Sequence, residues 1–170
     1  GGLELWYQPI FDLGTRSLVG FEALARWFHR DDGPIAPDCF IRIAEETGLI
    51  VPLGTWALRT ACQTLGRWRA ENAALGGLSV HVNVSGVQLA QPDFPLLVRS
   101  AIADAGIEPR QLIVELTESV LIETRSVAIP HLQELREFGV GWLRLKLSKP
   151  GAVSDSKAVG VVIERGRRPD

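Results

Sequence analysis

The sequence predicts an α/β fold in which mostly parallel strands form a sheet and helices cover its outside. Strand-like apolar runs alternate with helical patterns along the chain, the order expected of parallel strands joined by helical crossovers. The 170 residues are 46% hydrophobic and 22% charged, the composition of one globular domain with a core. No GxGxxG pattern follows the first strand, which removes the main support for a dinucleotide-binding sheet. A doubly wound sheet and a (β/α) barrel are both compatible with these observations.

Five segments have the composition of strands, with β-branched and aromatic residues between turn formers. In chain order they read LELWYQPIF, LVGFEALARW, LSVHVNVS, LIVELTES and, more weakly, WLRLKL. Four segments have helical spacing of apolar residues, and they read PDCFIRIAEETG, LGTWALRTACQTLGRWRAEN, FPLLVRSAIADAG and SVAIPHLQELREFG. Pro37 near the start of the first helix and Gly48, Gly106 and Gly139 at helix ends predict where these helices begin and stop.

The charge balance excludes some partners. Eighteen basic and twenty acidic residues give a net charge of -2, without the dense Lys/Arg cluster expected for binding DNA or a membrane surface. No apolar run approaches the roughly 18 residues that span a bilayer, and no signal peptide opens the chain, so we expect a cytoplasmic protein. Cys39 and Cys62 are isolated and are expected to be small buried side chains in a reducing compartment. The chain opens on Gly-Gly and contains no Met, which indicates a piece of a longer protein.

Strand parity places three oxygen-bearing side chains on one face of the sheet. Successive residues of a strand point to opposite faces, so the valines around Asn83 face the helices and Asn83 faces away from them. The same alternation separates Glu115 from its apolar neighbours, and Glu22 from Phe21 and Ala23. Asn83, Glu115 and Glu22 lie near the carboxyl ends of their strands. In a barrel, this end is the inside of the mouth, where active sites lie.

A metal site accounts for this placement. Burying Glu22 and Glu115 close together costs several kcal/mol unless one carboxyl takes up a proton or a cation compensates their charges. Two carboxylates and one amide form an all-oxygen set, which suits Mg²⁺ or Mn²⁺ better than softer metals. The alternative for each residue is a polar side chain that hydrogen-bonds to the backbone or to its neighbours. For His81, inside the strand that holds Asn83, we expect that alternative.

Five separated motifs occur in the order and spacing of one known family. They read YQPIFDL, GFEALARW, FIRIAEETGLI, VNVSGVQL and VELTES, and residues 22–24 themselves spell EAL. From Leu3 to Gly139 the chain resembles the EAL domain family. The resemblance implies a modified TIM (β/α)₈ barrel that hydrolyses the bacterial second messenger cyclic di-GMP to linear pGpG, using two Mg²⁺ or Mn²⁺ ions.

The resemblance also implies roles for individual residues. Three residues resemble the metal ligands of the family: Glu22, Asn83 and Glu115. Arg26 resembles the arginine that holds a substrate phosphate, and Gln8 and Leu24 match positions that contact the nucleotide. Glu118 resembles the glutamate that steadies the loop after its strand, and it is expected to belong to the catalytic set. The family further implies a homodimer and an accompanying sensory or GGDEF-type domain.

The chain departs from the family pattern after LREFGV. The family continues there into a strand ending in DDFGTG, whose aspartates bind metal, whereas this chain reads GWLRLKLSKPGAV. The stretch LRLKLSKP resembles a later family strand, on which Lys146 matches the catalytic lysine. On that alignment residues 1–170 are one partial EAL-type domain, with gaps near 141–144 and 150–154 and with the last barrel strands absent. A complete (β/α)₈ barrel usually needs about 250 residues.

Three interpretations follow from this departure. The intact protein is a cyclic di-GMP phosphodiesterase whose omitted segments carry the aspartates, a degenerate domain that binds cyclic di-GMP without cleavage, or a truncated remnant that serves as an interaction surface. We favour the first, because a barrel that lacks a central strand leaves two open strand edges. It predicts a chain break between Val140 and Leu145 and a vacant position between the strands of Lys146 and Glu115. Direct pairing of those two strands would favour the binding module.

Overall fold

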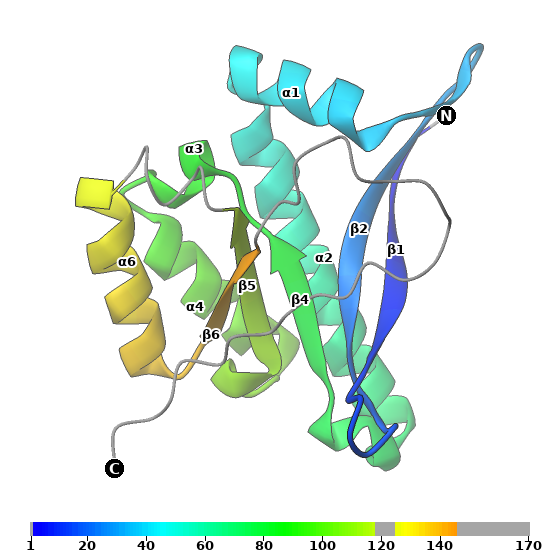
Figure 1. The fold of residues 1–170 in the computed structure, drawn as a ribbon, viewed down its shortest axis with the longest axis vertical. Helices are drawn as coiled ribbons and strands as arrows, with labels where there is room; N and C mark the ends of the chain where they lie inside the picture. The colour runs from blue at the N-terminus through cyan, green and yellow to red at the C-terminus, as the bar shows by residue number, and fades with distance from the viewer. Residues whose placement is uncertain (1, 118–124, 146–170) are drawn as a thin grey trace.

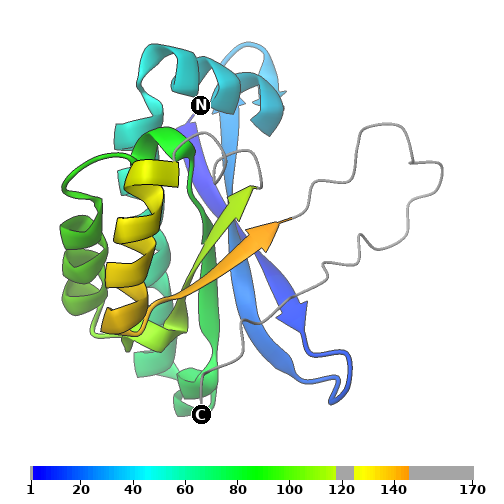
Figure 2. The ribbon, with the colours of Figure 1, turned by 60° about the vertical axis from the view of Figure 1, so that its left-hand side comes forward.

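The computed structural model describes residues 2–117 and 125–145, which form one sheet with helices packed against it (Figure 1). The strands are β1 (Gly2–Phe11), β2 (Leu18–His29), β3 (Gly33–Ile35), β4 (Ser79–Asn83), β5 (Leu112–Thr117) and β6 (Gly141–Leu145). The helices are α1 (Pro37–Thr47), α2 (Ile50–Glu71), α3 (Gly86–Leu89), α4 (Phe94–Ala105) and α6 (Arg125–Phe138), with 3₁₀ turns η1 (Ala73–Gly77) and η2 (Pro109–Gln111). The strand order is β1-β2-β4-β5-β6, and β3 pairs with the end of β2. Seen from the side, α2, α4 and α6 form a layer on one face of the sheet (Figure 2).

The first two strands are antiparallel, unlike the pairs β2–β4, β4–β5 and β5–β6. β1 and β2 pair along nearly their whole length, and a short loop of residues 12–17 joins them. Asp12 holds this loop, since its Oδ1 accepts hydrogen bonds from the backbone N–H groups of Gly14 and Thr15 at 3.0 and 2.8 Å. So short a loop has no room for a crossover helix. The predicted parallel arrangement is therefore confirmed only for β2, β4, β5 and β6.

The core fills the space between the parallel strands and the helices. The strands contribute Ala23, Val80, Val82, Leu112, Val114 and Leu116, and the helices contribute Leu58, Cys62, Leu65, Val98 and Leu135. All of them are buried, so the predicted apolar face of each strand is the one that meets the helices. α2 and α4 approach closely where Gly66 faces the backbone of Ala105. A Cβ at position 66 would lie 2.2 Å from the carbonyl oxygen of Ala105, so the two helices pack only with glycine there.

Glycines end three helices where the sequence predicted. α1 begins at Pro37 and is followed by Gly48, which has a φ of 76°. Gly106 follows α4 with a φ of 63°, and Gly139 follows α6 with a φ of 101°. Glycine adopts these left-handed conformations without the steric penalty that a side chain would bring. The predicted helix ends are therefore confirmed.

The sixth strand corrects one prediction. β6 pairs directly with β5 in parallel, in unbroken register from Gly141 opposite Ile113 to Leu145 opposite Thr117. The predicted vacant position between the strand leading to Lys146 and the strand of Glu115 is therefore wrong. The chain turns at the end of α6, and a strand that follows a crossover helix commonly pairs with the strand before it. Lys146 itself and residues 150–154 lie outside the described residues.

Two expectations from composition have different outcomes. Cys62 is buried in α2, as predicted, whereas Cys39 is exposed on α1, so the prediction of two buried cysteines is wrong for Cys39. α1 buries Phe40 and Ala44, and Cys39 lies off the face that these two residues define.

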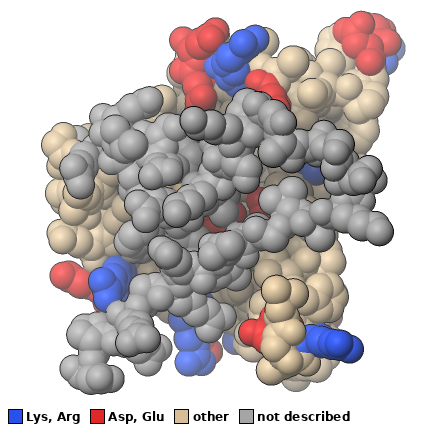
Figure 3. Space-filling view, in the orientation of Figure 1, with Lys and Arg blue, Asp and Glu red and all other residues tan. Residues whose placement is uncertain are grey.

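Among the described helices, none is both long and apolar enough to cross a membrane. On the visible described surface, acidic and basic side chains form small separate groups of both signs (Figure 3).

Candidate functional site

Three neighbouring parallel strands bring Glu22, Asn83 and Glu115 together. In the register of β2, β4 and β5, Glu22 lies opposite His81, and Asn83 lies opposite Glu115. The residues that alternate with them, Ala23, Val82 and Val114, are buried in the helix-facing core. Glu22, Asn83 and Glu115 therefore share the face of the sheet that is turned away from the helices.

Two side chains of β4 hold the two glutamates by diagonal hydrogen bonds. Asn83 donates from Nδ2 to Oε1 of Glu22 at 2.8 Å. His81 Nδ1 lies 2.7 Å from Oε1 of Glu115, and the two atoms share a hydrogen bond. The other ring nitrogen of His81 shares a hydrogen bond with Oγ of Ser79 at 3.1 Å. β4 thus holds the carboxylate of β2 with one side chain and that of β5 with another.

The electrostatics of Glu22 favour a nearby cation. Burial raises the pKa of the Glu22 carboxyl, and the charge of Glu115 adds to that rise. The hydrogen bond from Asn83 and the charges of His81 and Arg26 oppose it. A raised pKa means that the negative charge is poorly solvated in the folded protein. A cation between the two carboxylates would stabilise the charged form that burial disfavours.

The donor set fits a hard divalent cation in part. Glu22, Asn83 and Glu115 offer carboxylate and amide oxygens, the ligand types that Mg²⁺ and Mn²⁺ prefer. Within residues 2–117 and 125–145, no three His, Cys, Asp or Glu side chains converge into a metal-binding group. A cation held here would thus need Asn83 beside the two glutamates, together with water, substrate or further residues of the protein.

β1 adds side chains to the same face. Gln8 lies opposite Glu22 and Trp6 lies opposite Leu24, so both β1 residues share the face of the two β2 residues. Arg26 lies with its guanidinium 5.8 Å from the centre of the Trp6 ring, and its Nη1 donates to the carbonyl of Ala25 at 2.9 Å.

The charge of Arg26 is available for an anionic ligand. Among the described residues, no carboxylate forms an ion pair with Arg26. The ring of Trp6 and the carbonyl of Ala25 stabilise its position without neutralising it. A guanidinium held in this way presents a planar fork that matches the geometry of a phosphate.

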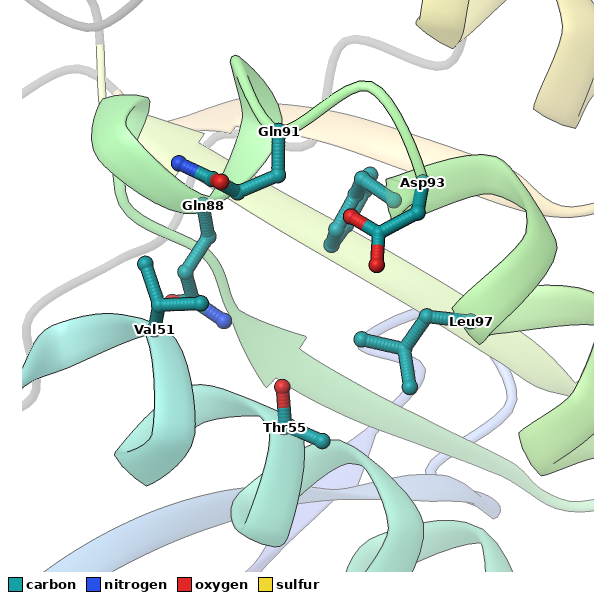
Figure 4. Close-up of a pocket in the computed structure, with 7 residues that line it drawn as sticks. Val51, Thr55, Gln88, Gln91, Asp93 and Leu97 are labelled. Carbon is teal, nitrogen blue, oxygen red and sulfur yellow. The ribbon is translucent and has the colours of Figure 1, made fainter.

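The loop after Asn83 is fixed by α3. Ser85 and Gln88 form a reciprocal capping box, in which the side chain of each accepts a hydrogen bond from the backbone N–H of the other. Gln88 also reaches a pocket between α2, α3 and α4, where its side chain lies near Val51 and Thr55 (Figure 4). Gly54 makes room for it, because a Cβ at that position would overlap the Gln88 amide. This pocket lies on the helix side of the molecule and shares no residue with the Glu22, Asn83 and Glu115 group.

The sequence identified most of this group but not its connections. Glu118 and Lys146, expected in the catalytic set, lie outside the described residues. His81 is hydrogen-bonded inside the sheet, as predicted, but its bond to Glu115 was not predicted. Ser79 and Trp6 were missed. The alternation of valines with Ser79, His81 and Asn83 was the available signal, since it places all three polar residues on one face.

Asn83 is the last residue of β4, whereas Glu22 and Glu115 lie inside β2 and β5, so the expected position near the strand ends holds only in part. A parallel β/α sheet that carries this carboxylate, amide and carboxylate on three adjacent strands, with an antiparallel strand before them, defines a partial β/α-barrel domain. The chain belongs to the EAL domain family, which matches residues 1–143. The α/β class and the incomplete modified barrel fold predicted from the sequence are therefore confirmed.

The chain is similar to much longer proteins. It is 42% identical over 140 residues to the uncharacterized protein y4lL of Sinorhizobium fredii, covering 82% of this chain and 16% of that protein. It is 40% identical over 139 residues to the oxygen sensor protein DosP of Escherichia coli, covering 82% of this chain and 17% of that protein. Among solved structures, the PaMucR phosphodiesterase in complex with c-di-GMP is similar, with a TM-score of 0.77 and 34% identity. That similarity covers 91% of this chain and 60% of the PaMucR chain.

Proposed function

We propose that this chain forms part of a cyclic di-GMP site and that the whole protein hydrolyses cyclic di-GMP to linear pGpG. The observation that carries the proposal is the row of Glu22, Asn83 and Glu115 on three adjacent parallel strands. Asn83 holds Glu22 and His81 holds Glu115 by hydrogen bonds. The similarity to the PaMucR phosphodiesterase, a c-di-GMP complex, supports cyclic di-GMP as the ligand. The residue roles implied by the family resemblance agree with this placement.

Glu22, Asn83 and Glu115 would hold the divalent cations, for which we propose Mg²⁺ or Mn²⁺. Bound cations would supply Lewis-acid activation of water and of the phosphodiester. In the hydrolysis, the water oxygen forms a bond to phosphorus and loses a proton, the bond from phosphorus to the 3′-oxygen breaks, and the 3′-oxygen gains a proton, so that no net proton is consumed. Glu118 and Lys146 stay proposed members of the catalytic set.

Other residues of the chain would orient the dinucleotide. Arg26 would bind a non-bridging phosphate oxygen, because its guanidinium has no carboxylate partner among the described residues. Gln8 and Leu24 are on the same face of β1 and β2 and would contact the nucleotide. Gln8 and Leu24 both lie next to Glu22. One dinucleotide could therefore place its phosphate at the cations and its base beside β1.

Binding without cleavage is the second candidate, and one observation favours it. β6 pairs directly with β5, and residues 141–150 contain no aspartate where the family has DDFGTG. A domain with Glu22, Asn83 and Glu115 but without those aspartates would keep part of one cation site and lack ligands for a second. Such a domain would act as a receptor for cyclic di-GMP.

The decisive experiment uses the protein as its gene encodes it. Purified protein is incubated with cyclic di-GMP and Mg²⁺ or Mn²⁺, and the products are separated by chromatography. Formation of pGpG that is lost in Glu22→Ala, with less than about a tenth of the wild-type turnover left, supports hydrolysis. Calorimetric binding in Ca²⁺ or EDTA without any pGpG supports the receptor. No binding under any of these metal conditions contradicts both and favours a remnant that acts as an interaction surface.

The wider assembly is also a proposal. We propose that residues 1–170 are one EAL-type domain of a cytoplasmic homodimer that also carries a sensory or GGDEF-type domain. The domain would carry gaps near 141–144 and 150–154 relative to the family. The chain covers only 16% and 17% of the two relatives described above, which supports the presence of further domains. Light scattering and the intact mass of the encoded protein test the dimer and the gaps.

A further inference from the structure

We propose that His81 is a positioning residue that fixes the carboxylate of Glu115 for metal binding, an inference that rests on the proposed metal site. His81 and Glu115 are among the few buried polar residues described, with relative exposures of 6% and 5%. Their side chains meet at 2.7 Å between Nδ1 and Oε1. A contact this short and this deep constrains the orientation of both groups.

The imidazole of His81 is braced at both nitrogens. Nδ1 bonds to Glu115 on β5, and Nε2 bonds to Oγ of Ser79 at 3.1 Å. Oγ of Ser79 also lies 3.2 Å from the carbonyl oxygen of Val19 on β2, and its single proton can be donated to only one acceptor at a time. A rotation of the ring would break the contacts on both sides. The side chains of Ser79 and His81 on β4 therefore contact β2 at Val19 and β5 at Glu115.

A glycine makes these contacts possible. Gly20 lies opposite Ser79 in the register of β2 and β4. A Cβ at position 20 would lie 2.5 Å from both the backbone oxygen and Oγ of Ser79. Any larger residue at position 20 would displace Ser79 from the Val19 carbonyl and loosen the brace behind His81.

The contact with His81 leaves Oε2 of the Glu115 carboxylate for a ligand. Oε1 is engaged by His81, and no described residue donates a hydrogen bond to Oε2. Glu22 has the matching arrangement, since Asn83 engages its Oε1. Residues that orient a metal ligand through a hydrogen bond typically change metal affinity by roughly 10- to 100-fold when they are removed. A residue that only satisfied a buried carboxylate would change stability and not affinity.

The test measures Mn²⁺ binding to the full-length protein by electron paramagnetic resonance, without substrate. His81→Leu removes both ring contacts and is expected to weaken Mn²⁺ binding by roughly 10- to 100-fold. His81→Asn and His81→Gln form a matched pair. The Asn amide nitrogen is bonded to Cγ, as Nδ1 is, whereas the Gln amide lies one bond farther, near Nε2. His81→Asn should therefore retain affinity close to wild type, and His81→Gln should lose it.

A control separates positioning from stability. Gln111 is buried at the opposite end of β5, where its Nε2 donates to the carbonyls of Gly76 and Leu78 at 2.9 and 3.0 Å. Gln111→Leu is expected to lower the melting temperature and to leave Mn²⁺ affinity unchanged. If His81→Leu does not fold, the comparison of His81→Asn with His81→Gln decides the question.

The outcomes distinguish this inference from the proposed function. Wild-type protein that does not bind Mn²⁺, or binds it equally well in Glu22→Ala, overturns the metal site and the role of His81 together. Wild-type binding that depends on Glu22 but is equal in all folded His81 variants overturns the positioning role alone. Weak binding in His81→Leu and His81→Gln, with recovery in His81→Asn, supports it.

Discussion

Asn83 donates a hydrogen bond to Glu22 although the two residues are not opposite each other in the sheet. The register places His81 opposite Glu22 and Asn83 opposite Glu115. The hydrogen bonds nevertheless cross, from Asn83 to Glu22 and from His81 to Glu115. Diagonal neighbours on adjacent strands are within reach of such side chains. The β4 residue that binds each carboxylate therefore lies two positions from the β4 residue opposite that glutamate in the register.

Glu22→Gln is expected to stabilise the metal-free protein at neutral pH. Burial raises the pKa of Glu22 above its ordinary value of 4.5, so the folded state holds this proton more tightly than the unfolded chain does. The contribution of Glu22 to stability is therefore fully present below pH 4.5 and is lost as the pH rises through the raised pKa. Glutamine keeps an acceptor for Asn83 and carries no charge.

The melting temperatures of both proteins in EDTA, between about pH 4 and about pH 8, test this prediction. The advantage of Glu22→Gln over wild type should grow with pH and disappear at the acidic end. A difference that does not change with pH, or a lower melting temperature of the variant at the alkaline end, would contradict it.

Arg26→Lys is expected to weaken cyclic di-GMP binding about tenfold, because lysine keeps the charge but loses the planar fork and the stacking on Trp6. Calorimetry of the full-length protein in Ca²⁺ measures the affinity. Arg42→Lys is the matched control, since Arg42 is exposed on α1. Equal affinities in the two variants would exclude a phosphate contact by Arg26.

Gly66→Ala is expected to destabilise the domain by about 1–3 kcal/mol, because its Cβ would push against the backbone of Ala105. Gly76→Ala serves as the control, since a Cβ at position 76 meets no atom within 4 Å. Its effect should stay within about 0.5 kcal/mol. Urea denaturation midpoints give both values. A tolerated alanine at position 66 would show that α2 and α4 can separate without cost.

Thiol labelling should distinguish the two cysteines. Burial raises the pKa of the Cys62 thiol to about 12, so almost none of it is thiolate near neutral pH. Cys39 is exposed. A disulfide reagent should therefore modify Cys39 in the native protein and reach Cys62 only after denaturation, as mass spectrometry of the labelled peptides would reveal. Native labelling that persists in Cys39→Ser would mean that Cys62 is accessible.

Patterns within single segments were read correctly from the sequence. Alternating valines fixed the inner and outer faces of β4, and glycines such as Gly48 and Gly106 marked helix ends, because both features depend on local geometry. The three residues of β3 were too short to have a period. The exposure of Cys39 depends on which face of α1 meets the core, and spacing from other cysteines contains no information about that.

Relations between segments were harder to predict. Alignment to a later family strand suggested a vacant position beside β5, yet β6 occupies it. Parity placed His81 and Glu115 on one face, but it could not show that their side chains reach each other diagonally. That contact depends on strand register and on side-chain rotamers, and both are set by packing between distant parts of the chain.

The core residues and the polar site residues of β4 alternate along the same short strand. Val80 and Val82 fill the core, while Ser79, His81 and Asn83 alternate with them on the other face. A slip of one residue would turn the valines outward and bury the polar side chains among apolar neighbours, at a cost of several kcal/mol. Errors in the placement of His81 and Asn83, which hold the two glutamates, are thus penalised by the same valines that fill the core.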